Sequence, residues 1–380
     1  MVIITSLLTS LTTGVIMYNN SRITSHISGA DLNQDENLKE FLKVYASLVG
    51  DYYQDIDSKG MLDEAIKAMF DYLGEDYTDY LNRQESDALA EKLVGKYQGI
   101  GVQIVDQNEI YKIFDDSPAQ NAGLKVGDKI ISVNQEDVRE KSSTEISDLI
   151  QKCEGKVQLE ILREEKTFEV ELELKTLFVP AIDYQLVRGG KKTIGYLSIL
   201  TFSDTVAEQV RNALKEMENE NISSLVIDVR GNTGGYLSQT SEILNMFLEK
   251  GKVIYSLAEK NDTKVYKDDT NEKRTYPIVV LINEATASAS EILASALKDS
   301  YGATLVGDIS YGKGKVQQTK GLEDGSMVKY TTARWMRPNG DCIDGVGITP
   351  DVYIEMEMPT NGQEVEDIQL KEALKILNEK

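Results

Sequence analysis

Strands and helices alternate along the second half of this 380-residue chain, and that alternation restricts the folds open to it. Four apolar stretches have the length and composition of strands, at 194–200, 223–229, 277–283 and 303–307. The segments between them fit helices. We therefore expect a layered α/β domain over residues 179–355, with functional residues in the loops at the strand ends, and a short amphipathic helix within 356–380.

The preceding stretch, residues 96–178, has a different pattern. Short β-rich strands are separated by glycine turns, and one helix is expected from Ser143 to Lys152. Two alternating strands, at 157–163 and 166–174, complete the pattern. A stretch of this size, about 80 residues, can form a separate domain.

The amino-terminal part divides into an uncharged segment and a helical region. Residues 2–18 carry no charge and are rich in Leu, Ile and Val. We interpret residues 1–35 as a signal or membrane-anchor segment with a linker, so the folded body is expected outside the cytoplasm, either secreted or anchored. A buried amino-terminal helix is the alternative. Apolar residues at three- and four-residue steps predict two helices within 36–95, with a turn near residues 57–60.

The charge balance limits the partners of the chain. There are 63 acidic and 41 Lys or Arg residues, which gives a formal net charge of -22 at pH 7. Binding of nucleic acid needs clustered Lys and Arg to displace counterions from phosphates, so nucleic acid is not an expected partner. The two cysteines, Cys153 and Cys342, have neither the spacing of a disulfide framework nor that of metal ligands. We expect no metal and no cofactor.

Histidine occurs once, at His26 near the amino terminus. A Ser-His-Asp triad, a Cys-His pair and a HExxH zinc site all need a histidine that the folded body lacks. A lysine can replace it as the base that activates a serine, provided that burial or nearby dipoles keep its amine neutral. Ser288, in a run of small residues, and Lys313, between two glycines, are the natural pair.

Ser288 lies in the run EATASASE at 284–291 and opens a predicted helix. Backbone N–H groups at the start of a helix stabilise negative charge that develops in acyl transfer, which suits a nucleophile. The alternative is that Ser288 or Ser290 only caps the helix, with Glu291 completing a capping box.

Two glycine-containing loops follow apolar strands. Residues 228–235 read DVRGNTGG, and such a loop either presents backbone N–H groups as an oxyanion hole or forms an ordinary strand-to-helix turn. Residues 307–314 match the opening of a phosphate-binding P-loop, but Gly314 is at the position where that loop needs Ser or Thr. Nucleotide binding is therefore not expected.

Residues 117–134 read SPAQNAGLKVGDKIISVN, and with the preceding loop at 99–102 they resemble a PDZ domain. The resemblance implies that a peptide adds as a strand beside the sheet while loop amides hold its terminal carboxylate. The peptide-binding residues that it implies are Gly99, Ile100, Gly101, Val102, Ile146 and Ile150. For the two isoleucines, packing in the core of the domain is the alternative.

Five motifs in order resemble the C-terminal processing (tail-specific) serine peptidases. They are the PDZ-like stretch, DxRGNxGG at 228–235, NxxxASASE at 283–291, YGKGxVQ at 311–317 and IDGVGITPD at 343–351. The match covers about residues 36–355 and includes the lead-in LGEDYTDYL at 73–81. It implies a multidomain α/β protein with a ClpP/crotonase-like core of ββα units, a PDZ domain inserted before that core and a helical amino-terminal region.

The resemblance also implies the catalytic roles. Ser288 would be the nucleophile, Lys313 the general base and Gln317 the residue that orients the lysine. The oxyanion hole would consist of the amides of Gly234 and Ala289, with Gly235 as the alternative to Gly234. The segment before the nucleophile departs from the pattern, since it reads Glu-Ala-Thr where relatives often have Gly-Gly-Ser, but the alignment of the motif residues holds.

The implied function is a serine endopeptidase that cleaves proteins chosen by their exposed C-terminal tails, is activated by tail binding and forms a homo-oligomer. Arg163 is a candidate sensor of tail binding, although we expect a solvated surface charge there. A different class of function is a peptide-binding adaptor whose peptidase-like domain is catalytically silent. The intact Ser288, Lys313 and Gln317 argue against the adaptor.

Overall fold

The computed structural model describes residues 35–114, 116–178, 180–189, 192–356 and 366–379. The uncharged segment that we interpret as a signal or anchor lies outside these residues. Among the helices that are described, none is both long and apolar enough to cross a membrane. The chain divides into two compact units, residues 1–75 and 76–380.

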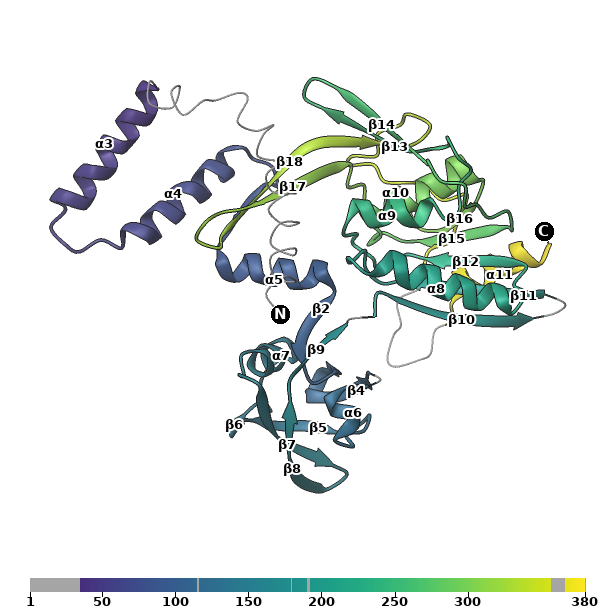
Figure 1. The fold of residues 1–380 in the computed structure, drawn as a ribbon, viewed down its shortest axis with the longest axis horizontal. Coiled ribbons are helices and arrows are strands. Elements are labelled where there is room, and N and C mark those ends of the chain that lie inside the picture. The colour runs from purple at the N-terminus through teal and green to yellow at the C-terminus, as the bar shows by residue number, and fades with distance from the viewer. Residues whose placement is uncertain (1–34, 115, 179, 190–191, 357–365, 380) are drawn as a thin grey trace, which may run out of the picture. The chain divides into compact units, whose positions relative to one another are not determined.

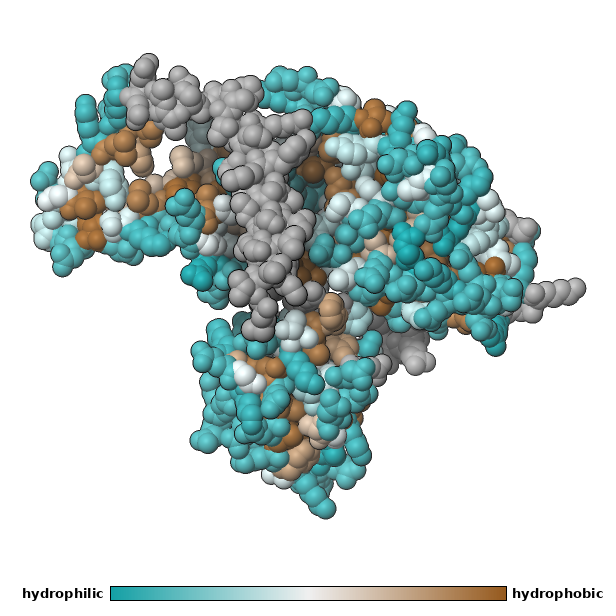
Figure 2. All heavy atoms as spheres, viewed as in Figure 1, coloured by the Kyte–Doolittle hydropathy of each residue, from teal (hydrophilic) through white to brown (hydrophobic). Residues whose placement is uncertain are grey.

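In its described residues, 35–75, the first unit contains two helices, α3 (Glu36–Asp51) and α4 (Ser58–Tyr72). Each begins after an aspartate, Asp35 or Asp57, whose side chain accepts backbone N–H groups of the first turn. Neither helix contains a buried residue, and Figure 2 shows hydrophobic side chains at the surface of both. The exposed apolar residues include Phe41, Leu42, Val44, Leu48, Val49, Met69 and Tyr72.

The second unit contains a β-rich domain whose main sheet has the strand order β3-β4-β5-β7-β8, with β6 paired to β5. The strands are β3 (Val102–Val105), β4 (Glu109–Ile113), β5 (Lys129–Val133), β6 (Glu136–Asp137), β7 (Lys156–Arg163) and β8 (Lys166–Glu173). Every second residue of β7 from Val157 to Ile161 is buried, the pattern of a strand with one face on a core. Two helices complete the domain, α6 (Pro118–Asn121) and α7 (Ser143–Gln151).

A two-stranded antiparallel ladder forms where the chain enters and leaves this domain. Strand β2 (Lys96–Gly99) pairs with β9 (Lys175–Phe178), so residues about 80 positions apart are joined by backbone hydrogen bonds. Before β2 comes helix α5 (Arg83–Val94). Gly95, between α5 and β2, lies against Ser203, since a Cβ at Gly95 would come within 2.9 Å of the Ser203 side chain.

The α/β core is built on a six-stranded sheet with the order β10-β11-β12-β15-β16-β19. The strands are β10 (Ile182–Gly189), β11 (Lys192–Ile199), β12 (Ser224–Asp228), β15 (Ile278–Ile282), β16 (Thr304–Gly307) and β19 (Val352–Tyr353). All neighbours from β11 onward are parallel, and β10 is an antiparallel edge strand. Every residue of β12 and β15 is buried, as expected for strands that helices cover on both faces.

Alternate residues of these strands face two different hydrophobic clusters. One face packs against α8 (Val206–Asn219), α9 (Leu237–Leu244) and α10 (Ala289–Ala296), with Leu225, Ile227 and Val280 in the cluster. The other packs against the C-terminal helix α11 (Ile368–Glu379), with Val226 and Val279. Figure 1 shows α8 and α9 against this sheet and α11 beside β11 and β12.

A second, antiparallel sheet was not predicted from the sequence. Its order is β1-β18-β13-β14, with β17 also paired to β18. The strands are β1 (Asp79–Leu81), β13 (Val253–Glu259), β14 (Thr263–Lys267), β17 (Lys315–Gly321) and β18 (Met327–Met336). In Figure 1, β17 and β18 form a long curved hairpin. The lead-in segment and the residues that follow Lys313 therefore belong to the same sheet.

Candidate active site

Ser288 is placed at the junction of β15 and α10 in a strained backbone conformation. It is half-buried, and its φ of 57° and ψ of -117° lie where residues with a side chain are rarely found. A strained serine on a strand-to-helix turn is a geometry that exposes a nucleophilic hydroxyl. Ser288 is also the N-cap residue of α10, so the structural role and the catalytic role expected for it are compatible.

The glycine-rich loop after β12 lies directly against Ser288. A Cβ on Gly234 would come within 2.9 Å of the Ser288 Cβ and 3.0 Å of the Ala289 nitrogen. Asn232 joins the loop to the serine segment, because its backbone oxygen accepts the Ala287 N–H at 3.0 Å and the Ser290 hydroxyl at 2.9 Å. Two motifs that are separated by almost 50 residues in the sequence thus form one site.

The two expected oxyanion donors differ in their availability. Among the described residues no acceptor is bound to the Ala289 N–H, which is the first amide of α10. The Gly234 N–H instead donates to the Asn232 Oδ1 at 2.9 Å, so in this conformation it does not serve as expected. The cause is the Asn232 side chain, which folds back over its own loop. Gly235, the alternative, packs on the Phe202 carbonyl, where a Cβ would come within 2.4 Å.

Glu291 is a fully buried carboxylate that joins the serine segment to the lysine segment. Its Oε2 accepts the backbone N–H groups of Ser288 at 2.8 Å and Lys313 at 2.9 Å. Its Oε1 accepts the Ser310 hydroxyl at 2.5 Å and the Gly312 N–H at 2.7 Å. Burial raises the pKa of Glu291, although these four hydrogen bonds favour its ionised form.

Lys313 is half-buried in the loop between β16 and β17. Its backbone oxygen accepts the Trp335 indole N–H at 2.8 Å, and its Nζ lies 4.5 Å from the centre of the Tyr77 ring. The flanking glycines are required by close packing, since a Cβ on Gly312 would come within 2.7 Å of a backbone nitrogen of the IDGVGITPD segment, and one on Gly314 within 2.6 Å of its Asp344 side chain. This segment therefore supports the lysine loop.

Gln317 lies on β17, four residues after Lys313. Its side-chain amide donates to the Thr331 hydroxyl of β18 at 3.3 Å. This bond joins the Gln317 amide to the neighbouring strand β18. The orientation of Lys313 by Gln317 stays a prediction.

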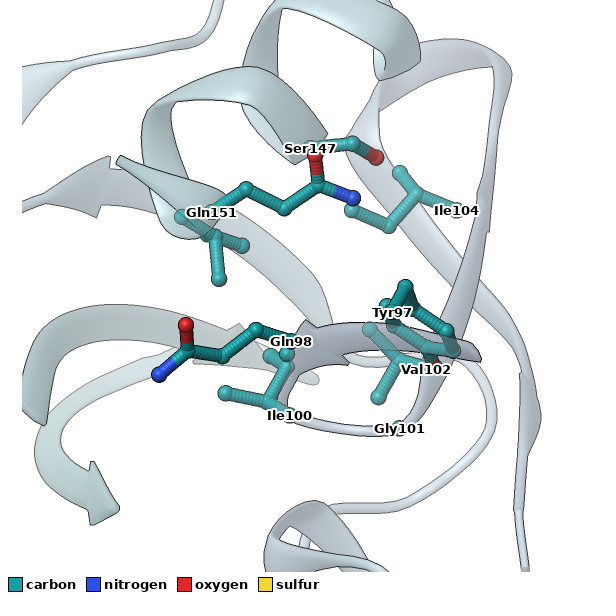
Figure 3. A pocket seen from close by; sticks show the side chains of 10 residues that line it. Tyr97, Gln98, Ile100, Gly101, Val102, Ile104, Ser147 and Gln151 are labelled. Atoms are coloured by element: carbon teal, nitrogen blue, oxygen red, sulfur yellow. The ribbon is translucent and has the colours of Figure 1, made fainter. Parts of the chain in front are cut away.

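The β-rich domain carries a pocket between α7 and the loop that follows β2 (Figure 3). Four implied loop residues and one implied helix residue line it, namely Gly99, Ile100, Gly101, Val102 and Ile150. The pocket is also lined by Tyr97, Gln98, Ile104, Ser147 and Gln151.

Ile146 does not line this pocket. It is fully buried in the core of the domain, as the alternative interpretation held, because its position on α7 faces the sheet.

Arg163 is not the solvated surface charge that we expected. Its guanidinium binds both oxygens of the buried Asp128, at 2.6 and 2.8 Å, and the Gly123 carbonyl at 2.9 Å. Burial opposes ionisation of Asp128, but the Arg163 hydrogen bonds and the Lys125 N–H hold the pKa of that carboxyl below its usual value. Arg163 thus fixes the turn of the GLxxGD motif.

Three residues of the site were not assigned a catalytic or positioning role from the sequence: Tyr77, Asn232 and Glu291. Glu291 had a signal, the capping-box spacing from Ser288, and Asn232 belongs to a quoted motif. Tyr77 lies in the quoted lead-in segment, but nothing in that segment indicates its contact with Lys313. Within the described part of the chain no group of three or more His, Cys, Asp or Glu side chains is arranged to hold a metal ion.

Known proteins are similar to this chain over most of its length. The models of peptidase family S41 and of the PDZ domain match residues 193–354 and 91–162. The carboxy-terminal processing protease CtpB of Bacillus subtilis (strain 168) is 36% identical over 363 residues, which cover 91% of this chain and 73% of that protein. CtpA of the same strain is 34% identical over 360 residues, with 93% and 76% covered.

A solved structure is also similar. The photosystem II D1 C-terminal processing protease is 25% identical with a TM-score of 0.53, and the similarity covers 90% of this chain and 92% of that one. With the serine and lysine segments joined by one carboxylate and the glycine-rich loop packed against the serine, the chain belongs to peptidase family S41, as a serine-type carboxy-terminal processing protease with a PDZ domain.

Proposed function

We propose that the chain cleaves peptide bonds with a catalytic dyad of Ser288 and Lys313. The observation that carries the proposal is the Glu291 carboxylate, whose Oε2 binds the backbone N–H of both residues. The strained backbone of Ser288 adds support, as does the neighbouring Ala289 N–H, which has no acceptor in the described part of the chain. Family membership identifies the chain as a serine peptidase, and the proposal adds that Lys313 is its general base.

The reaction begins when neutral Lys313 takes the proton of the Ser288 hydroxyl. The serine oxygen attacks the peptide carbonyl, and the Ala289 N–H stabilises the negative oxygen of the tetrahedral intermediate. The lysine ammonium then protonates the leaving amine and becomes neutral again. Neutral Lys313 next takes a proton from a water molecule, whose oxygen attacks the acyl carbon and releases the acyl chain from Ser288. A second oxyanion donor requires either that the Gly234 N–H leaves Asn232 or that Gly235 supplies it. Gln317 orients the lysine in this scheme.

The PDZ pocket selects substrates by their C-terminal tails. A tail adds as a strand beside the sheet, with its carboxylate at the amides of residues 99–102 and an apolar side chain against Ile150. Tail binding then activates the peptidase. The mixed apolar and amide lining of the pocket supports binding of a peptide.

Three further parts of the proposal concern the whole chain. The core is assigned to the ClpP/crotonase-like fold, on the basis of its parallel strands and covering helices. The chain forms a homo-oligomer, which the exposed apolar residues of α3 and α4 support. It acts outside the cytoplasm, secreted or held by a membrane anchor at its amino terminus, on the basis of the uncharged residues 2–18.

The dyad is tested by cleavage of an unstructured protein with an apolar C-terminus. Ser288→Ala and Lys313→Ala are each expected to lower kcat about a thousandfold or more, because the nucleophile and its base act as one unit. Ser295→Ala, on the same helix, and Lys320→Ala, on β17, are matched controls that should retain activity. Retained cleavage in either dyad variant would contradict the proposal.

Two additional measurements separate the enzyme from the silent adaptor. A fluorophosphonate probe should label the wild-type protein and not Ser288→Ala, whereas absence of labelling even with a tail peptide present would favour the adaptor. Because the base must be neutral, kcat/KM should rise with pH, and a rate that is flat from mildly acidic to alkaline pH would exclude a lysine base.

A further inference from the structure

Tyr77 contacts the lysine of the dyad although it is 236 residues away in the sequence. Its ring centre lies 4.5 Å from the Lys313 Nζ and 5.5 Å from the Lys315 Nζ. Sheet pairing places it there, since the Thr78 hydroxyl accepts the Thr331 N–H at 3.0 Å and β1 continues along β18. Strand β18 also pairs with β17, which begins two residues after Lys313. The segments of Tyr77 and Lys313 are therefore held by the same sheet.

The Tyr77 ring meets the lysines as a neutral phenol. A hydrogen bond with the Tyr311 hydroxyl, burial, and the nearby charges of Asp344 and Asp76 raise the pKa of Tyr77 above its usual value. The side chain therefore presents the negative face of an aromatic ring to the lysines, and not the full charge of a phenolate. Attraction between a cation and a ring face within about 6 Å is a recognised stabilising contact.

We propose that Tyr77 is a positioning residue of the dyad, whose ring face holds the Lys313 amine beside the nucleophile segment and stabilises the ammonium that forms there. The inference rests on the proposed Ser288–Lys313 function. A ring attracts the ammonium far more than the neutral amine, so the contact strengthens as Lys313 takes the serine proton. An interaction that is stronger in the transition state than in the ground state raises kcat.

The test separates the ring from the hydroxyl. In Tyr77→Leu the ring is lost, and we expect kcat and the rate of fluorophosphonate labelling to fall about tenfold while KM stays within about twofold. In Tyr77→Phe the ring remains, so both rates should stay within about threefold of wild type. Tyr311→Phe, which removes only the partner of the hydroxyl bond, should behave like Tyr77→Phe.

A second variant keeps the inference testable if Tyr77→Leu fails to fold, because it retains an aromatic ring of nearly unchanged shape. Replacing Tyr77 with trifluorophenylalanine weakens the negative face of the ring, so labelling should be several times slower than in Tyr77→Phe at an equal melting temperature. Equal rates in these two proteins, or an equal loss in Tyr77→Phe and Tyr77→Leu, would overturn the inference. Tyr353→Leu, an exposed tyrosine of β19, is the matched control for loss of a ring.

Lys313→Ala distinguishes failure of this inference from failure of the proposed function. If Lys313→Ala is labelled at the wild-type rate, the dyad is wrong and the role of Tyr77 falls with it. If Lys313→Ala is inactive while Tyr77→Leu is folded and labelled at the wild-type rate, the dyad stands and only the role of Tyr77 is rejected.

Discussion

At the scale of single residues, Glu291 is the group that joins the Ser288 segment to the Lys313 segment. Both of its oxygens accept two hydrogen bonds, and three of the four donors are backbone N–H groups that cannot turn into acceptors. In Glu291→Gln an NH2 group must face at least one of these N–H groups. We therefore expect kcat to fall at least about tenfold, because the lysine segment moves relative to Ser288, with a smaller loss of melting temperature than in Glu291→Ala.

The control for this prediction is a second capping box in the same chain. Glu145 accepts the Ser142 N–H at 2.8 Å at the start of α7, so it has the same local role as Glu291. It is exposed, however, and its hydrogen bonds stay within its own helix start. Glu145→Gln should leave kcat unchanged, and an equal loss in both variants would show that capping alone explains the effect.

The residues that come together at the site were predictable from the sequence where a motif contains them, and their catalytic roles stay predictions. The absence of histidine in the folded body and the paired motifs indicated Ser288 and Lys313, and the capping-box spacing indicated that Glu291 meets the Ser288 N–H. The direction of the Gly234 N–H could not be predicted, because it depends on how the Asn232 side chain turns. The contact of Tyr77 with Lys313 depends on pairing between distant strands, which leaves no local pattern.

At the scale of elements, the C-terminal helix is joined to the glycine-rich loop by Arg230. Its guanidinium binds Asp228 at the end of β12, and it also binds Asp367 at 2.7 and 3.0 Å and the Gln369 side chain at 2.9 Å. Its two carboxylate partners favour the charged form, so the pKa of Arg230 is raised although burial opposes this. Arg230 thus holds both the loop that carries Asn232 and the start of α11.

Arg230→Ala would leave these carboxylates without their partner. We expect the free energy of unfolding to fall by about 3 kcal/mol, the usual cost of breaking a buried ion pair on one side, and kcat to fall as the loop loosens. Denaturant unfolding and turnover measure the two effects. Arg188→Ala is the control, because its ion pair with Glu220 is exposed and contributes little. An unchanged unfolding midpoint in Arg230→Ala would contradict the role of this cluster.

Elements with a strong apolar pattern were the ones that the sequence predicted. Strands β12 and β15 are short apolar runs buried at every position, and the amphipathic α8 between two of the strands fits the expected α/β alternation. Strands β17 and β18 have mostly half-buried or exposed residues. Their sequences therefore show neither the two-residue apolar period of a strand nor the 3.6-residue period of a helix. Their sheet also includes β1, about 250 residues earlier in the chain, and such pairing is a tertiary effect.

At the scale of the whole molecule, one chain combines a PDZ domain that carries a pocket with the core of a serine peptidase. The PDZ domain has its own hydrophobic core, separate from the two clusters of the α/β core. The domain is connected to the rest of the unit through the β2–β9 ladder, and β2 carries Tyr97, Gln98 and Gly99 of the pocket. A tail bound in this pocket would thus contact β2, the strand with which the chain enters the domain.

If tail binding activates the peptidase, a free tail peptide should accelerate fluorophosphonate labelling of Ser288 in the wild-type protein. Val102→Asp places a negative charge in the pocket where the tail carboxylate is expected, so it should abolish this acceleration and raise KM for tailed substrates about tenfold or more. Val105→Asp, three residues along the same strand and exposed, adds the same charge outside the pocket and should behave as wild type. Labelling of wild type that is insensitive to tail peptide, with a KM effect of Val102→Asp retained, would mean that the PDZ domain only captures substrate and does not switch the enzyme on.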